Sequence, residues 1–145
     1  MPIRTLDELL AQPEAVTGKR VFVRADLNVP LAKGGQAIGD DSRIRASLPT
    51  LEALIGAGAR VVLASHLGRP KGERKAELSL GIVAEALSER LPTTVYFTDD
   101  CVGDAAANAA ASLANGEVLL LENLRFHKAE TDNEPAFAKA LAGLA

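Results

Sequence analysis

Short runs of apolar residues alternate along the chain with longer segments in which apolar positions recur every three or four residues. The short runs are typical of β-strands that are buried on both faces. The longer spacing is typical of amphipathic helices. We predict four strands, at residues 20–24, 60–64, 94–97 and 117–121.

Four helices are predicted between and after these strands, at residues 44–55, 80–91, 102–113 and 133–144. The first contains Pro49, where a kink is expected because proline removes a helical hydrogen bond. The second follows Ser79, a residue suited to the N-cap. The third stops near Gly116. The fourth has Pro135 early, where proline is favoured.

This alternation of strands and helices favours a parallel sheet, because right-handed crossovers of such length leave few other arrangements. We therefore predict an α/β fold: a three-layer α/β/α, doubly wound, Rossmann-like sheet. A further strand is expected after the last helix. Residues 1–145 are accordingly expected to form a partial domain that is incomplete at its C-terminal end.

The composition narrows the classes of ligand. Aromatic residues make up 3% of the chain and the formal net charge is -3, which argues against a base-stacking platform and against a surface for nucleic acid or an anionic membrane. One cysteine and two histidines cannot build a disulfide framework or a four-ligand Cys/His metal cluster. Because no secretion signal or long apolar run is present, we expect a cytoplasmic location.

Polar residues follow three of the predicted strands. They lie within residues 24–30, 65–70 and 122–126, and a fourth polar segment, residues 41–45, opens the first long helix. In an open parallel sheet, ligands bind outside the carboxyl ends of the strands. A binding site is therefore predicted at this edge.

Taken singly, these residues have simpler explanations. Asp26 and Asn28 suit an Asx-type turn before a proline. His66 could be an ordinary loop histidine, Arg69 a surface ion pair and Arg125 a partner for a helix end. Independent surface residues have no reason to converge on one edge, however. Together they predict a local anion site, since the planar guanidinium fork suits phosphate and carboxylate.

Other acidic residues are interpreted without a metal ion. The pairs Asp40-Asp41 and Asp99-Asp100 precede predicted helices, so helix capping and the helix dipole explain them. Glu122 is a candidate general base, but a carboxylate beside several arginines is a weak base. No metal site is predicted.

Four segments of the chain resemble the N-terminal, substrate-binding domain of the phosphoglycerate kinase family. They are GKRVFVRADLNVP, DSRIRASLPT, SHLGRP and LLLENLRFHKAE, beginning at residues 18, 41, 65 and 119. They occur in the family's order and spacing over nearly the whole chain. The resemblance implies a glycolytic phosphotransferase that moves a phosphoryl group between 1,3-bisphosphoglycerate and ADP, giving 3-phosphoglycerate and ATP.

The resemblance also implies roles for individual residues. Arg43 would be catalytic, offsetting the charge of the phosphoryl group in transit. Asp26 and Asn28 would orient the glycerate, with His66 near its carboxyl end. The remaining residues implied are Arg69 and Arg125 at the 3-phosphate, Leu27, Leu67 and Gly68 in the substrate-binding segments, and Arg24 in support.

Further implications concern what lies outside this segment. The co-substrate, Mg-ATP or Mg-ADP, would bind to a C-terminal nucleotide-binding domain that residues 1–145 do not contain. No cofactor-binding residue is therefore expected here. The intact family enzyme is expected to be a monomer, and the chain by itself is expected to be inactive.

Two alternatives belong to other functional classes. One is a non-catalytic module that binds small phosphorylated acids. The other is a receiver-like signalling domain, which requires an aspartate after a central strand and a lysine after a later one. The strand ends here carry His-Leu-Gly-Arg and Glu-Asn-Leu-Arg instead, which disfavours the receiver.

Overall fold

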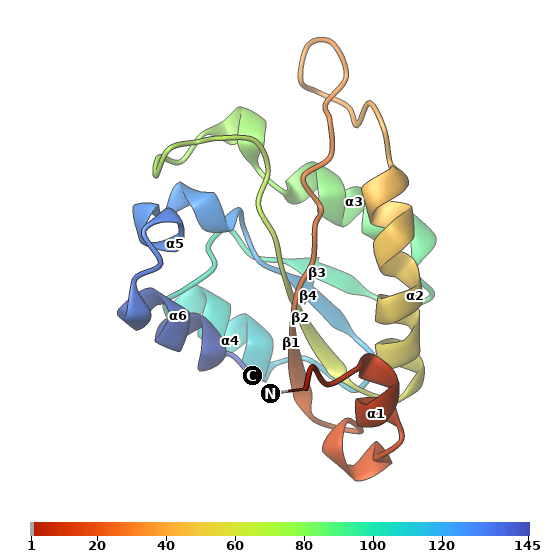
Figure 1. Cartoon of the computed structure of the whole chain (residues 1–145). Helices are drawn as coiled ribbons and strands as arrows, with labels where there is room; N and C mark the ends of the chain where they lie inside the picture. The colour runs from red at the N-terminus through yellow and green to blue at the C-terminus, as the bar shows by residue number, and fades with distance from the viewer. Residues whose placement is uncertain (1) are drawn as a thin grey trace.

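The computed structural model describes residues 2–145 and contains a four-stranded, all-parallel sheet (Figure 1). The strands lie within the predicted ranges: β1 Arg20–Arg24, β2 Arg60–Ala64, β3 Val95–Phe97 and β4 Val118–Leu120. Their spatial order is β1-β2-β4-β3. The predicted parallel α/β fold is confirmed.

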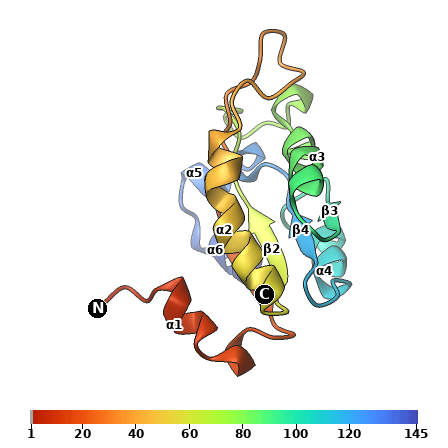
Figure 2. The same ribbon diagram turned by 90° about the vertical axis from the view of Figure 1, so that its right-hand side faces the viewer.

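Helices cover both faces of the sheet, which gives three layers. Helices α2 (Ser42–Gly56) and α3 (Gly81–Arg90) pack on one face, and Figure 2 shows them side by side there. Helices α4 (Asp104–Ala111) and α6 (Pro135–Ala142) pack on the other face. No helix within residues 2–145 is long and apolar enough to span a membrane.

Strand β2 shows why the central strands lack a polar face. Val61 and Leu63 pack into the core on the α2 and α3 side, whereas Val62 and Ala64 pack into the core on the α4 and α6 side. All four side chains are fully buried. Successive strand residues point to opposite faces, so a strand between two helix layers must be apolar at every position.

Burial on both faces, which we expected of every strand, is wrong for β1 and β3. Each lies at an edge of the sheet and has one neighbouring strand. On β3, Tyr96 is 47% exposed and Phe97 is 37% exposed. Arg20 and Arg24, at the two ends of β1, are also exposed. The apolar pattern alone does not distinguish a central strand from an edge strand.

The helix ends differ from expectation in several places. Helix α2 continues through Pro49 as one element. Leu80 is the N-cap of α3, although the Ser79 hydroxyl still accepts a hydrogen bond from the Gly81 amide at 3.2 Å. Helix α4 begins only after Gly103, so the capping role predicted for Asp99-Asp100 is wrong.

Several short elements were not predicted. Helix α1 (Leu6–Leu10) begins with a capping box formed by Thr5 and Glu8. Helix α5 (Lys128–Thr131) precedes α6. Three 3₁₀ turns are also present: η1 Pro13–Ala15, η2 Ala76–Leu78 and η3 Leu124–Phe126. Two of them, η2 and η3, lie in segments that follow the carboxyl ends of β2 and β4.

Candidate functional site

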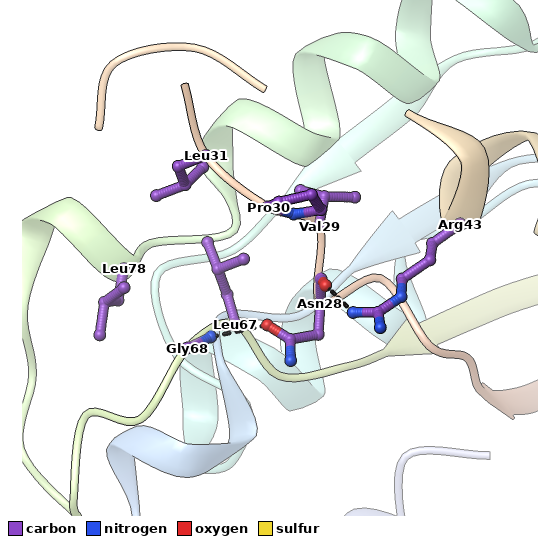
Figure 3. Close-up of a pocket in the computed structure, with 8 residues that line it drawn as sticks. All are labelled: Asn28, Val29, Pro30, Leu31, Arg43, Leu67, Gly68 and Leu78. Atoms are coloured by element: carbon purple, nitrogen blue, oxygen red, sulfur yellow. Dashed lines mark hydrogen bonds between the residues drawn. The ribbon is translucent and has the colours of Figure 1, made fainter. Parts of the chain in front are cut away.

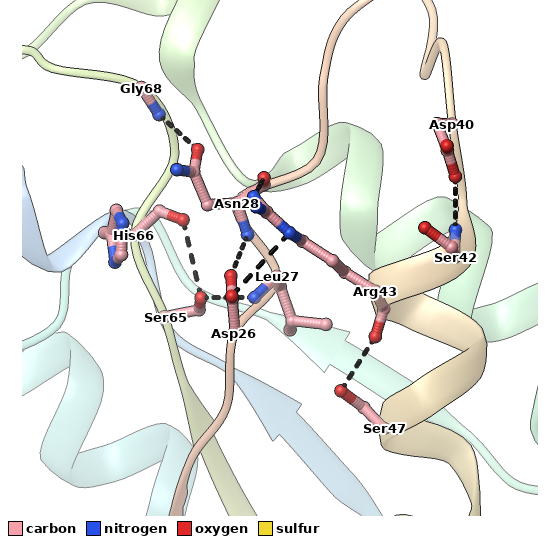
Figure 4. A network of polar contacts seen from close by, with 10 residues as sticks. All are labelled: Asp26, Leu27, Asn28, Asp40, Ser42, Arg43, Ser47, Ser65, His66 and Gly68. Carbon is pink, nitrogen blue, oxygen red and sulfur yellow. Dashed lines mark hydrogen bonds and ion pairs between the residues drawn. The ribbon is translucent and has the colours of Figure 1, made fainter.

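The loops that follow β1 and β2 are joined by hydrogen bonds (Figure 4). The Leu27 amide donates to the Ser65 hydroxyl at 2.9 Å, and the Gly68 amide donates to Asn28 Oδ1 at 2.8 Å. The Asn28 amide donates to Asp26 Oδ1 at 3.1 Å, which is the Asx-type turn that the sequence indicates. The turn and the binding role are therefore compatible, because the turn fixes the two side chains.

Arg43 reaches this turn from the first turn of α2. Its Nη1 donates a hydrogen bond to the Asn28 carbonyl oxygen, and its Nε lies 3.6 Å from Asp26 Oδ2. The side chains of Arg43 and Asp26 are 46% and 64% exposed. The structure thus brings together Asp26, Asn28 and Arg43 as predicted, and leaves the guanidinium accessible from solvent.

The N-terminus of α2 is held by two aspartates. Asp40 Oδ1 accepts a hydrogen bond from the Ser42 amide at 2.7 Å, which lowers the pKa of Asp40. Asp41 pairs with Arg45 at 2.9 Å and with Arg90 of α3 at 2.8 Å, and these hydrogen bonds lower the pKa of Asp41. Asp41 is the N-cap residue but makes no side-chain cap hydrogen bond and instead ties α2 to α3, so the helix-end amide is satisfied by Asp40, one residue earlier.

A cavity of about 470 Å³ opens beside Asn28 and Arg43 (Figure 3). Its other lining residues are mainly apolar: Val29, Pro30, Leu31, Leu67, Gly68 and Leu78. None of the other arginines of this edge lines it.

Gly68 is favoured by the backbone of the β2 loop, because residues with a side chain rarely adopt its positive φ. Its φ is +62°, and a Cβ atom at this position would lie 2.7 Å from Leu78 Cδ2. The absence of a side chain at Gly68 therefore lets the Leu78 side chain pack against the loop. Leu27 and Leu67 are 0% and 1% exposed, main chain included, so in this structure they support the loops and present almost no surface to a ligand.

A second group of charges lies at the ends of β1 and β4. Glu130 Oε1 accepts from Arg24 Nη2 at 2.7 Å, and its Oε2 accepts from Arg125 Nε at 3.2 Å. Arg69, on the β2 loop, is exposed and has no ion pair within residues 2–145. The sequence reasoning missed Glu130, because its partner Arg24 lies 106 positions away along the chain.

His66 is half-buried near this charged group. Burial lowers its pKa, and the nearby Arg125 and Arg24 guanidiniums lower it further, against opposite effects of Glu130 and Asp26. Its Nδ1 is buried and has no hydrogen-bond partner among the residues that the structure describes. The arrangement favours a neutral imidazole, because a second ring proton would be placed in a positively charged setting.

The folded protein is therefore expected to lose stability through His66 on acidification. Unfolded His66 takes up a proton near the ordinary histidine pKa of 6.5, whereas folded His66 takes it up only at lower pH. Between these values the unfolded state binds more protons, so the free energy of unfolding decreases as the pH is lowered. It levels off below the folded pKa. Urea unfolding of wild type and His66→Gln between pH 8 and 5 measures the difference. A histidine NMR titration midpoint at or above 6.5 would contradict the prediction.

Two buried polar residues after β4 form hydrogen bonds that hold the segment following β2. Glu122 accepts hydrogen bonds from the Ser79 hydroxyl at 2.6 Å and from the Leu80 amide at 2.8 Å. Asn123 Nδ2 donates to the carbonyl oxygens of Leu67 and Leu78 at 2.8 and 3.0 Å. Glu122 is 4% exposed, which places it in the scaffold and away from an incoming ligand.

A cluster of Asp100, Cys101 and His127 lies apart from the arginines. Asp100 Oδ1 and His127 Nε2 are 2.8 Å apart, and the three potential ligand atoms lie within 4.8 Å of one another. Burial raises the pKa of Cys101 to about 12, so its thiol stays protonated. Asp100 and His127 already satisfy each other. The cluster is accounted for as a structural contact between the β3 loop and the start of α5.

These features define a class of protein: an open parallel α/β domain whose polar and arginine side chains gather at the carboxyl edge of the sheet, the edge at which domains of this class bind ligands. The chain belongs to the phosphoglycerate kinase family, whose family model matches residues 11–145.

Individual relatives are similar over most or all of the chain. It is 58% identical to a phosphoglycerate kinase of Salinispora tropica over 149 aligned positions, which cover 100% of this chain and 37% of that protein. A chloroplastic phosphoglycerate kinase of Volvox carteri is 58% identical, with 86% of this chain and 27% of the relative covered. The chain therefore spans about a third of the length of the curated relatives it matches.

Solved structures of the family have the same fold. The phosphoglycerate kinase of Coxiella burnetii matches with a TM-score of 0.80 and 36% identity, covering 98% of this chain and 33% of that one. The enzyme of Pyrococcus horikoshii matches with a TM-score of 0.76 and 35% identity, covering 89% of this chain and 33% of that one.

Proposed function

We propose that residues 1–145 supply the 3-phosphoglycerate site of a phosphoglycerate kinase. The observation that carries the proposal is the convergence of four arginines, Arg24, Arg43, Arg69 and Arg125, with His66 at one edge of the sheet. Such a group favours an anion locally in a chain whose net charge is negative. The family's reaction is the transfer of a phosphoryl group between ATP and the carboxylate of 3-phosphoglycerate.

In this proposal the chain binds and orients the acid. Arg69 and Arg125 hold the 3-phosphate, with Arg24 in support. Asp26 accepts a hydrogen bond from the glycerate hydroxyl, and the Asn28 side-chain NH2 group donates to a glycerate oxygen. The neutral His66 lies near the carboxyl end. These contacts lower the entropic cost of bringing the carboxylate to the phosphorus.

Arg43 acts on the group being transferred. A carboxylate oxygen of 3-phosphoglycerate attacks the γ-phosphorus of ATP, and the bond from that phosphorus to the β-phosphate oxygen breaks, so that ADP leaves. The glycolytic direction is the reverse. Negative charge spreads over the three equatorial oxygens, and in this proposal Arg43 offsets it. No side-chain nucleophile is needed.

The magnesium nucleotide binds elsewhere in this proposal. The carboxylates at this edge are paired with arginines, Asp26 with Arg43 and Glu130 with Arg24 and Arg125. Magnesium requires oxygen ligands in octahedral geometry, and arginine-paired carboxylates do not fit it. The chain alone is therefore expected to bind the acid and to be inactive, while the complete enzyme acts as a monomer.

Titration of 3-phosphoglycerate into the chain, followed by NMR, tests the proposal. Saturable shifts of the Gly68 and Arg69 amides are expected, and Arg69→Gln should weaken binding about tenfold or more, since it removes a charge-assisted hydrogen bond. Glycerate without its phosphate is the control ligand and should bind far more weakly. Absence of saturable binding would contradict the proposed function.

A chimera distinguishes the enzyme from a non-catalytic binding module. In it, residues 1–145 replace the matching segment of the Salinispora tropica relative. Turnover of 3-phosphoglycerate with ATP is expected of an enzyme segment. Tight binding without turnover in a folded chimera would favour the module.

A further inference from the structure

We propose that Glu130 is a positioning residue, which fixes the Arg24 and Arg125 guanidiniums so that the 3-phosphate meets a preformed site. The inference rests on the proposed function and adds to it a residue that makes no contact with the ligand. It predicts that removing a negative charge from the site weakens the binding of an anion.

The geometry places one carboxylate between two arginines from distant parts of the chain. Glu130 lies in α5, Arg24 ends β1 and Arg125 lies in η3 after β4. The two oxygens are divided between the partners, Oε1 with Arg24 Nη2 at 2.7 Å and Oε2 with Arg125 Nε at 3.2 Å. The Glu130 side chain is 14% exposed, whereas those of Arg24 and Arg125 are 49% and 36% exposed. The carboxylate is thus the most buried member of the bridge, and the two guanidiniums extend from it toward solvent.

The bridge leaves the terminal edge of the Arg125 guanidinium available to a ligand. Glu130 engages Nε of Arg125, so the terminal Nη1 and Nη2 edge of that guanidinium has no ion pair within residues 2–145. This edge can form two parallel hydrogen bonds with a phosphate. The Arg125 amide is also fixed, because it donates to Asn123 Oδ1 at 3.0 Å. Both ends of the arginine are therefore held before a ligand arrives.

The electrostatics give Glu130 a second reason to be present. Arg24 and Arg125 both disfavour a proton on His66, while Glu130 favours one. The same carboxylate offsets the repulsion between the two guanidiniums and keeps them close together. Without it, each long side chain would be free to turn into solvent and would have to be ordered by the ligand.

Charge and position predict opposite results for Glu130→Gln, which makes the inference testable. The substitution keeps the shape of the side chain and makes the site more positive. If charge alone mattered, 3-phosphoglycerate would bind more tightly. If position dominates, it binds more weakly. We expect the dissociation constant for 3-phosphoglycerate to rise about tenfold, corresponding to the loss of one charge-assisted contact.

The measurements are an NMR titration of the chain and steady-state kinetics of the chimera. In the chimera, the KM for 3-phosphoglycerate should rise about tenfold in Glu130→Gln while kcat and the KM for ATP stay within twofold, as expected for lost ground-state binding. Glu134→Gln removes the same charge from an exposed position that has no ion pair within residues 2–145, and it should match wild type. Glu130→Asp keeps the charge on a shorter stem and should lie between wild type and Glu130→Gln.

The possible results separate the two proposals. An unchanged or lower dissociation constant in a folded Glu130→Gln chain overturns the role of Glu130 and leaves the proposed function intact. Failure of the unaltered chain to bind 3-phosphoglycerate overturns the proposed function itself. Should Glu130→Gln fail to fold, Glu130→Asp with wild-type affinity would also overturn the inference, because a shorter carboxylate cannot bridge both arginines.

Discussion

Replacing Arg43 by alanine in the chimera is expected to lower kcat about 10²- to 10³-fold, while the fold and the affinity for ATP are retained. The guanidinium lies at the open end of the site, with Nε 3.6 Å from Asp26 Oδ2. Donors aimed at charge that develops in the transition state have effects of this size when they are removed. Single-turnover phosphoryl transfer, measured at saturating 3-phosphoglycerate, isolates the chemical step.

Arg45→Ala serves as the matched control for this prediction. Arg45 lies two residues further along the same helix and pairs with Asp41 at 2.9 Å, away from the turn that holds Asn28. It should change kcat less than twofold. Near-normal kcat in Arg43→Ala would remove Arg43 from the catalytic machinery, and an equal loss in both variants would indicate a general disturbance of α2.

The largest loss of stability is expected from Asn123→Ala. Asn123 is fully buried, donates to the carbonyl oxygens of Leu67 and Leu78, and accepts from the Arg125 amide. Alanine would leave one buried group, the Leu67 carbonyl, and two partly buried groups without their partner. Each such group costs about 1–3 kcal/mol, so the free energy of unfolding should fall by about 3 kcal/mol or more.

Urea unfolding measures this loss, provided that the dependence of the unfolding free energy on urea concentration is the same in wild type and variant. Asn108→Ala is the matched control, because Asn108 is exposed on α4 and alanine is the better helix former there. Its stability should change by less than about 0.5 kcal/mol. A loss below about 1 kcal/mol in Asn123→Ala would mean that water replaces the amide, and it would contradict the importance given to these hydrogen bonds.

The sequence predicted the sheet and the edge that carries the candidate site for one physical reason. Carboxyl ends of parallel strands always share an edge, whatever the order of the strands. Asp26, Asn28, His66, Arg69 and Arg125 could therefore be placed together before the order β1-β2-β4-β3 was known. The order itself depends on how each crossover packs across the sheet, and no local pattern encodes it.

What the sequence reasoning missed is mostly long-range. Glu130 lies in a polar segment, and nothing nearby marks it as the partner of Arg24. Asn123 stands beside Glu122 in a polar cluster, yet its burial follows from the packing of two other loops. Helix α1 is different, because the Thr5 and Glu8 capping box is a local signal that could have revealed it.

The hydrogen bonds that join the three loops have a consequence for how the site can be lost. Ser65 holds Leu27, Asn28 holds Gly68, and Asn123 holds Leu67. Each bond runs from a side chain of one loop to the main chain of another, so the loops form a single mechanical unit across the edge of the sheet. Substitution of Ser65 or Asn123 could therefore abolish ligand recognition during evolution while every arginine is retained. A survey of variants that considered only the charged residues would miss this loss.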